Sequence, residues 1–368
     1  MKLEQLSMQS LAIPLRGSFR HAAAERRETE TVWVEARTSA VLGCGEGCPR
    51  GYVTGEDVAS ALAFFARHRA ALLREIHDLA SLERYAAAHT TDIDRNPAAW
   101  CAVELALLDA LARECGVSVE AMLGLRDVQG AFRYSAVLGI EDRESARRKI
   151  AAYRELGFID FKLKLSGDLG QDRVAVADLL DGARRDLRLR LDANNLWPSR
   201  REAVEYLAAL RAPAFAIEEP LPAGAHAELA RLSDATRLRV ILDESCTRAE
   251  QLAQLEPPAE RWIVNLRVSK LGGVLRSRAV LAQARTRGIA CIVGAQVGET
   301  SLLTRAGLCI AAQAAPDLLA QEGGFGTMLL TEDVCDPPLQ WGAGGMLHMD
   351  AELRPGWGLD IAPRKPQS

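Results

Sequence analysis

Charged side chains that could transfer a proton and hold a metal ion recur at regular intervals in the middle of the chain. Lys162 and Lys164 lie in FKLKL, and three carboxylates follow in LDANN, IEEP and LDES, namely Asp192, Glu218 and Asp243. Neighbouring motifs are about 25–28 residues apart, and one strand–helix repeat takes roughly 25–30 residues. We therefore expect a lysine pair and three carboxylates at the same end of neighbouring parallel strands.

The alternation of apolar and polar residues predicts which side chains point inward. In FKLKL the apolar Phe161 and Leu163 must face outer helices, so Lys162 and Lys164 face the interior of the sheet. The same rule turns six further side chains inward: Asp192, Asn194, Glu218, Asp243, Asn265 and Arg267. One inward lysine or aspartate is more often half of a structural ion pair, but the joint pattern favours catalysis.

Three converging carboxylates need a counter-charge, and a divalent cation that prefers oxygen ligands supplies it. Mg²⁺ suits one carboxylate per strand, with Mn²⁺ as the alternative. A substrate carboxylate on such a cation allows its α-carbon to lose a proton, because the metal stabilises the resulting enediolate. We expect Lys164 to be the base and Lys162 to be its charged neighbour.

Composition excludes several other classes of protein. The chain has 368 residues, 48% hydrophobic and 26% charged residues and a formal charge of −4. These values suit a globular protein of about two domains and argue against a nucleic-acid or membrane-surface role. The eight cysteines are scattered and form no zinc set, which favours reduced thiols. With no targeting segment and no run of ~18 apolar residues, we expect a cytoplasmic protein.

The pattern of predicted elements changes near residue 130. Before it we expect strands within residues 3–15 and 29–40, no regular element over the Arg-rich 16–28, and a Gly-rich loop over 43–57. Two helices follow, one capped near Thr54 and one beginning at Asn96 and Pro97. After residue 130, strands and helices alternate, which indicates a closed parallel barrel. The strands are expected near 133–138, 158–164, 188–192, 214–218, 239–243, 262–267, 289–294 and 318–321.

The motifs KLK, DAN, EEP, DES and NLRVSKLGG together resemble the enolase superfamily, in particular its muconate lactonizing enzyme subgroup. The resemblance implies an α/β fold, a modified TIM barrel of (β/α)7β type with an N-terminal α+β capping domain. It implies a capping domain at 1–130, a barrel at 131–325 and a C-terminal return to the capping domain at 326–368. It also implies Mg²⁺ on Asp192, Glu218 and Asp243, a base at Lys164, a small carboxylate substrate and a homo-oligomer.

One departure from that pattern bears on the reaction. The subgroup carries a second lysine on its sixth strand, and the matching residue here is Arg267; Lys270 matches a different lysine three residues on. Arginine is a poor base because it keeps its proton. We therefore expect a one-base lyase, such as a dehydratase, or a cycloisomerase. The alternatives are a racemase or epimerase of an N-substituted amino acid, with Lys270 as second base, and a catalytically silent metal-binding homologue.

Residues further out suggest how a substrate is held. Cationic segments over the barrel mouth, containing Arg20, His21 and Arg50, indicate a second anionic group on the substrate. Solvated arginines and an idle histidine are the alternative. The other candidate contacts are Asn194, Gln296, Glu299, Ser301 and Glu322. For Ser301, which opens a helix, simple capping explains the residue equally well, and for Arg267 an ion pair inside the barrel is the alternative.

Overall fold

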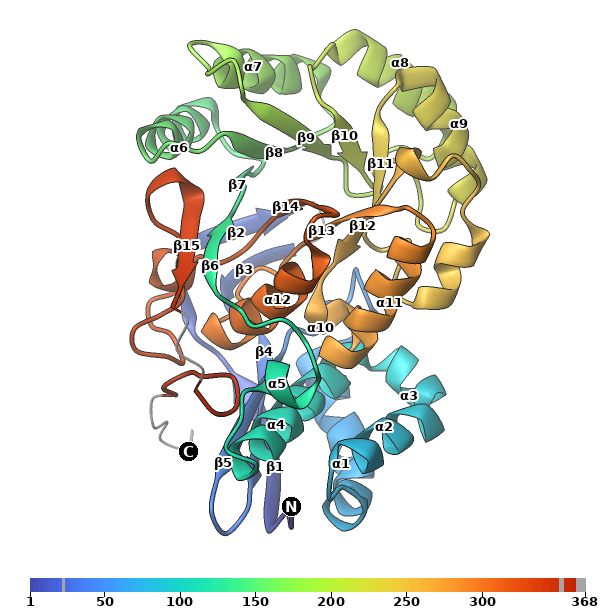
Figure 1. The fold of residues 1–368 in the computed structure, drawn as a ribbon. Helices are drawn as coiled ribbons and strands as arrows, with labels where there is room; N and C mark the ends of the chain where they lie inside the picture. Colours follow the sequence, from blue (N-terminus) through green and yellow to red (C-terminus); the bar gives the residue numbers. More distant parts are fainter. Residues whose placement is uncertain (22–23, 351–353, 362–368) are drawn as a thin grey trace.

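The computed structural model describes residues 1–21, 24–350 and 354–361. An N-terminal part rich in antiparallel strands and helices lies against a curled parallel sheet surrounded by helices (Figure 1). This is the α/β barrel architecture with a capping part that the sequence predicts. Within the described residues, no helix is long and apolar enough to cross a membrane.

The N-terminal part is built on a three-stranded antiparallel sheet in the order β1–β4–β5. Its strands are β1 (Gln5–Leu11), β4 (Thr31–Arg37) and β5 (Leu42–Gly47). Five helices follow: α1 (Val58–Glu75), α2 (Leu79–Ala88), α3 (Thr90–Arg95), α4 (Pro97–Glu114) and α5 (Val119–Met122). Helix α4 begins at the expected Pro97, and Asp57 rather than Thr54 caps α1 by accepting from the Ser60 backbone N–H.

The Gly-rich loop expected over residues 43–57 is partly wrong, because β5 occupies its first residues. The glycines of β5 share one face, and that face lies on the backbone of α4. A Cβ at Gly45 would lie 2.0 Å from the carbonyl oxygen of Ala102, and one at Gly47 would lie 2.0 Å from that of Ala98. Glycine here permits a close strand–helix approach rather than a turn.

Residues 16–28, for which no regular element was expected, lie largely in a hairpin. Strand β2 (Pro14–His21) pairs antiparallel with β3 (Ala24–Glu28). Seven of the thirteen residues from 16 to 28 are Arg, His or Glu, so the sequence lacks the apolar alternation that marks a half-buried strand.

The parallel sheet contains eight strands that follow one another in sequence order from β7 to β14. The expected strands are confirmed as β7 (Ala136–Leu138), β8 (Asp160–Lys164), β9 (Arg188–Asp192), β10 (Ala216–Glu218), β11 (Arg239–Leu242), β12 (Trp262–Leu266), β13 (Ala290–Val293) and β14 (Leu318–Gln321). The helices between them are α6 (Arg143–Glu155), α7 (Leu169–Leu180), α8 (Arg200–Leu210), α9 (His226–Thr236), α10 (Val268–Leu271), α11 (Val274–Thr286) and α12 (Ser301–Ala314). Short 3-10 turns stand between β11 and β12, namely η1 (Ala249–Gln254) and η2 (Ala259–Arg261).

The seam between the first and last barrel strands is closed differently from the other strand pairs. Strands β7 and β14 are the two ends of the hydrogen-bonded order, and the backbone N–H of Ser135 donates to the carbonyl of Gln321 at 2.7 Å across the gap. The strand expected near 133–138 is in fact two, since β6 (Gly130–Arg133) leaves the barrel and pairs with β15 (Met346–Met349) (Figure 1). A separate ribbon thus runs beside the seam.

The chain after the barrel runs through two 3-10 turns, η3 (Gly326–Met328) and η4 (Ala343–Gly345), and then returns to the N-terminal part. Trp357 is buried there: its backbone N–H donates to Asp109 and its indole N–H to the carbonyl of Leu105, both on α4. All eight cysteines are free thiols, as expected, and all but Cys115 are buried.

Candidate active site

Strand register brings the key charged residues of the barrel into one row. Lys164 lies opposite Asp192 in the β8–β9 pair, and Asp192 lies opposite Glu218 in the β9–β10 pair. Asp243 follows the end of β11, the next strand. The three carboxylates are at most 1% exposed, and the apolar partners Phe161 and Leu163 are buried on the other face of β8. The inward orientation inferred from residue alternation is therefore confirmed.

Lys162 lies at the centre of a carboxylate cluster. Its Nζ atom is 2.7 Å from Glu322 Oε2, 3.2 Å from Glu218 Oε2 and 3.3 Å from Asp192 Oδ2. Burial alone would lower the pKa of Lys162, but the surrounding carboxylates outweigh it and raise the pKa. The surrounding carboxylates therefore favour the protonated form of Lys162.

Lys164 lies one step nearer to solvent. Its Nζ donates to Asn194 Oδ1 at 3.0 Å and is 3.5 Å from Asp192 Oδ2. It lines a cavity of about 490 Å³ at the carboxyl-terminal end of the strands, together with Lys162, Asn194 and Arg267. Of the two lysines, Lys164 therefore combines looser hydrogen bonding with access to the cavity.

On the opposite side of the cavity, Arg267 forms ion pairs with two of the acids. Its Nη2 atom is 2.7 Å from Asp243 Oδ2 and 3.4 Å from Glu218 Oε1, and Nη1 donates to Gln296. The ion-pair alternative for Arg267 thus describes its contacts. Burial and the neighbouring Asp192 carboxylate raise the pKa of Glu218 to about 6, although the Lys162 ammonium opposes this.

Lys270 lies behind this wall of the cavity rather than on it. Its Nζ donates to the Asp243 carboxylate at 2.9 Å, to the Asp243 carbonyl at 2.7 Å and to the Asn265 carbonyl at 2.8 Å. The residue is 1% exposed and is absent from the cavity lining. Burial opposes ionisation of Asp243, but Arg267 and Lys270 outweigh it and lower the pKa of this carboxyl.

The three carboxylates offer a suitable donor set for a divalent cation. Asp192 Oδ2 is buried and accepts no hydrogen bond, and its contacts are the ammonium groups of Lys162 at 3.3 Å and Lys164 at 3.5 Å. Within the described residues, no three acidic, histidine or cysteine side chains already form a group that encloses a metal ion, and the Lys162 and Arg267 cations lie against these carboxylates. The residue types fit Mg²⁺, and those two cations would share the carboxylates with it.

The comparisons with known proteins support one family. The family model described as enolase C-terminal domain-like matches residues 144–365. The chain belongs to this family, within the enolase superfamily. The L-Lys-D/L-Arg epimerase of Methylococcus capsulatus is 29% identical over 369 residues, covering 98% of this chain and 99% of the relative.

Two further relatives of this superfamily member differ in their reactions. Muconate cycloisomerase 1 of Rhodococcus opacus is 28% identical over 367 residues, covering 95% of this chain and 94% of the relative. A crystal structure of a dipeptide epimerase from Methylococcus capsulatus, complexed with Mg and the dipeptide L-Arg-D-Lys, superposes with a TM-score of 0.83. That structure is 27% identical, and the match covers 98% of this chain and 100% of the other. The chain is thus similar along its length to both epimerases and cycloisomerases.

The outer candidate residues of this superfamily member separate into two groups. Asn194, Gln296, Glu299 and Glu322 line the cavity, although Glu322 also accepts from Lys162. Two others do not line it: Arg50 and Ser301. The structure does not describe the side chains of Arg20 and His21, which lie on β2 beside residues outside the described ranges.

Arg50 and Ser301 are buried and have partners elsewhere. The Arg50 guanidinium donates to four backbone carbonyls, including that of Val297, and so ties the β5–α1 connection to the barrel. The Ser301 hydroxyl accepts from the Leu339 backbone N–H. At the same helix start, the Thr300 backbone N–H donates to Glu46. The N-terminus of α12 is therefore satisfied by the chain's own carboxylates and is not open to a substrate anion.

Several residues near the site were not identified from sequence. Arg190 is fully buried inside the barrel, where its Nη2 donates to Glu322 at 2.9 Å and its Nη1 donates to Asp160. It shares the parity of Asp192 on β9, so strand alternation alone could have identified it. Glu244, next to Asp243, lines the cavity, and burial raises its pKa. Tyr52, which belongs to the same GCPRGY segment over the barrel mouth as Arg50, does reach the cavity from the N-terminal part.

Proposed function

We propose that this chain is a Mg²⁺-dependent enzyme that removes the proton α to a substrate carboxylate, with Lys164 as its single base. The observation that carries this proposal is the asymmetry of the cavity. Lys164 faces it from β8, and the group facing it from the β12 side is the guanidinium of Arg267. Because arginine keeps its proton, the reaction needs only one face of the α-carbon.

Asp192, Glu218 and Asp243 would hold the Mg²⁺. When bound, the ion supplies a positive charge that stabilises the negative charge developing on the substrate carboxylate. The Lys162 ammonium is held in place by Glu322, Glu218 and Asp192 and adds a second fixed positive charge. Because its carboxylate neighbours favour the protonated form of Lys162, we assign the base to the other lysine.

The proton balance of a one-base reaction can be written for this chain. Lys164 Nζ takes the α-proton, and the electron pair left on the α-carbon forms a double bond to the β-carbon. The β-oxygen then leaves, and it recovers the same proton from the Lys164 ammonium. If that oxygen is a hydroxyl, water is released; if it belongs to a lactone ring, the ring opens and the product is an isomer. Arg267, paired with Gln296, is positioned to bind an anionic oxygen on the opposite side of the substrate.

A second candidate function is epimerisation, which the likeness to the L-Lys-D/L-Arg epimerase and to the N-succinyl-L-Arg/Lys racemase of Bacillus cereus favours. It requires a proton donor on the Arg267 face of the substrate. Lys270 fills this role poorly, because three acceptors hold its Nζ outside the cavity.

The test is incubation in D₂O with Mg²⁺ and a pooled set of hydroxy acids, diacids, lactones and N-acyl amino acids. We expect a product lighter by one water, or an isomer formed by opening or closing a lactone ring. The wild type and the exposed-lysine control Lys2→Ala should form it, and Lys164→Ala should not. Inversion with deuterium gained at the α-carbon would favour the epimerase. If Lys164→Ala matches the wild type in every reaction, the base assignment is wrong. If no reaction occurs while Mg²⁺ binds, a silent metal-binding homologue becomes the better hypothesis.

Three further expectations remain proposals. They are the domain boundaries near residues 130 and 325, a cytoplasmic location, and a homo-oligomeric assembly. Limited proteolysis, cell fractionation and light scattering, respectively, test them.

A further inference from the structure

A second cavity, of about 710 Å³, lies at the opposite end of the barrel strands from Lys164. Asp160, Arg188 and Leu318 line it, and they are the first residues of β8, β9 and β14. The remaining lining comes from residues 126–135 beside the seam, from the end of α12 with Ala315 after it, and from the rest of β14. We call it the seam cavity. It shares no lining residue with the cavity that contains Lys164.

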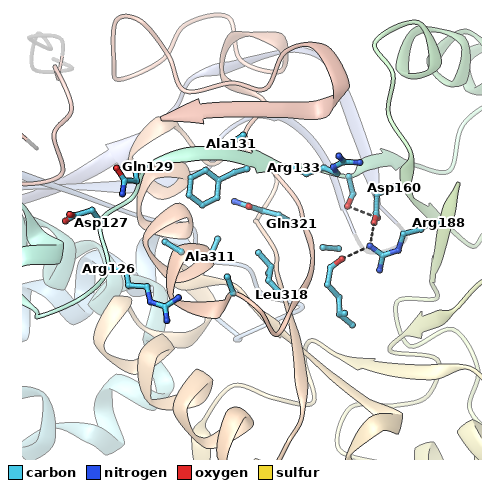
Figure 2. Close-up of a pocket in the computed structure, with 16 residues that line it drawn as sticks. Arg126, Asp127, Gln129, Ala131, Arg133, Asp160, Arg188, Ala311, Leu318 and Gln321 are labelled. Atoms are coloured by element: carbon cyan, nitrogen blue, oxygen red, sulfur yellow. Dashed lines mark hydrogen bonds and ion pairs between the residues drawn. The ribbon is translucent and has the colours of Figure 1, made fainter. Parts of the chain in front are cut away.

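The seam cavity has an apolar floor and a cationic rim. The floor includes Phe132, Ala312 and Leu319. Figure 2 shows Arg126 at one end and Arg188 at the other, with Arg133 above the latter. Arg188 is engaged by Asp160 at 3.2 Å and by the Leu319 carbonyl.

Two of the rim arginines remain available to a ligand. In the part of the chain that the structure describes, the exposed guanidinium groups of Arg126 and Arg133 form no ion pair and no hydrogen bond. The acids in the lining are Asp127 and Asp160, and Asp160 is already neutralised by Arg188 and Arg190. The rim therefore carries an excess of positive charge, which favours an anionic ligand.

A buried amide supplies an independent sign of a ligand. Gln321 is 2% exposed and lines the seam cavity, and its Nε2 donates to the Tyr134 hydroxyl at 2.8 Å. Its Oε1 is buried and has no hydrogen-bond partner. A buried amide oxygen without a partner is unfavourable, and a donor on a bound ligand would remove that penalty. Figure 2 places Gln321 between the two charged ends of the cavity.

We propose that the seam cavity binds a small amphipathic organic acid. Its carboxylate pairs with Arg126 or Arg133, its apolar body lies on the floor of leucine, alanine and phenylalanine side chains, and a hydroxyl or N–H group bonds to Gln321. A purely apolar ligand would leave Gln321 unpaired, and a polyanion would bring further negative charge towards Asp127. The three features together select a monoanion with one further hydrogen-bonding group.

The probe is 6-hydroxy-2-naphthoate, a fluorescent acid without an α-hydrogen, which the reaction proposed above cannot consume. Its comparison compounds are 2-naphthoate, without the hydroxyl, and 2-naphthol, without the carboxylate. Fluorescence anisotropy on the full chain should show the first binding at least fivefold more tightly than either comparison compound. Equal affinities for all three, or no binding at millimolar probe, would overturn the proposal.

Variants then locate the bound probe. Arg126→Ala/Arg133→Ala should weaken binding at least tenfold, whereas the matched exposed pair Arg84→Ala/Arg201→Ala should leave it unchanged. Gln321→Leu should remove the preference for the hydroxyl. If Gln321→Leu does not fold, Ala312→Trp, which fills the cavity, should abolish binding.

The outcome is separable from the proposed reaction. Binding that survives both the double arginine change and Ala312→Trp, but is lost in Lys164→Ala, would place the probe in the Lys164 cavity and overturn this inference. Loss of α-proton transfer in Lys164→Ala together with unchanged probe binding would leave both proposals standing.

Discussion

Replacing Lys270 with methionine tests whether this residue positions the carboxylate of Asp243, a proposed metal ligand, or transfers a proton to the substrate. The change keeps most of the side-chain volume and removes the ammonium. Three acceptors lose their donor at once, namely the carboxylate and carbonyl of Asp243 and the carbonyl of Asn265. Because Lys270 is 1% exposed, water does not replace that donor without rearrangement.

The size of the effect follows from burial. Removing one partner of a buried ion pair typically costs about 3–5 kcal/mol of folding free energy, since the other charge is left uncompensated. Arg267 still pairs with Asp243, so we expect a loss near the lower end, about 3 kcal/mol. The matched control is Lys149→Met, which removes an ion pair with Glu141 from a lysine that is 53% exposed. Exposed pairs contribute about 0–1 kcal/mol.

The assay is urea denaturation followed by tryptophan fluorescence, with Lys270→Met and Lys149→Met compared at the same protein concentration. The reaction found for the wild type is then measured at saturating Mg²⁺. We expect a large drop in the denaturation midpoint for Lys270→Met only, with product still formed through Lys164. Equal midpoints for the two variants would refute the buried-anchor reasoning. Normal stability with abolished epimerisation would instead make Lys270 the second base.

Three other changes probe the opposite wall, the cavity rim and the capping part. Arg267→Lys places an amine opposite Lys164, so we expect deuterium from D₂O to enter the α-carbon from both faces, which chiral chromatography of the product measures. Unchanged stereochemistry would refute the placement of residues 164 and 267 on opposite faces of the substrate. Burial raises the pKa of Glu299 to about 8, so this acid is neutral at pH 7 and gains a negative charge above pH 8. The KM of an anionic substrate should therefore rise above pH 8 in the wild type and stay level in Glu299→Gln, and parallel profiles would contradict this. Gly45→Ala forces a Cβ to within 2.0 Å of the Ala102 carbonyl oxygen and should destabilise the protein by roughly 1–3 kcal/mol in urea denaturation, whereas Gly51→Ala, with no heavy atom nearer than 3.9 Å, should have little effect.

Residue alternation was sufficient to predict the centre of the site, because the side chains of a strand must point alternately to its two faces. Lys162, Asp192 and Glu218 are inward for this reason alone. The same rule applied to β9 identifies Arg190, whose partner Glu322 lies on the far side of the barrel. Alternation along a strand therefore predicts which side chains point into the barrel. Their ion-pair partners depend on which strands face one another once the sheet has closed.

Long-range contacts explain why other predictions from sequence failed. From its sequence context, Arg50 was expected to be a cationic residue over the barrel mouth. Its guanidinium instead donates hydrogen bonds to backbone carbonyls, including that of Val297, nearly 250 positions away. The alternating glycines of β5 resemble a loop, because the helix that lies against them, α4, is about 50 residues further on. The local sequence around Arg50 or around β5 does not predict either of these distant contacts.

Burial, rather than sequence, assigns different roles to the two lysines of β8. Both point inward, and two residues along a strand separate them by one repeat of the pleat. Lys162 lies deeper in the barrel, where it forms an ion pair with Glu322. Glu322 also pairs with Arg190, and Arg190 pairs with Asp160. These contacts form a continuous chain of ion pairs inside the barrel. A cation embedded in such a chain cannot give up its proton without leaving several carboxylates unbalanced. Lys164 has a neutral amide as its nearest partner and one more distant carboxylate, and it opens onto the cavity. We therefore propose that Lys164 transfers the proton and that the Lys162 ammonium supplies the positive charge that stabilises the substrate anion.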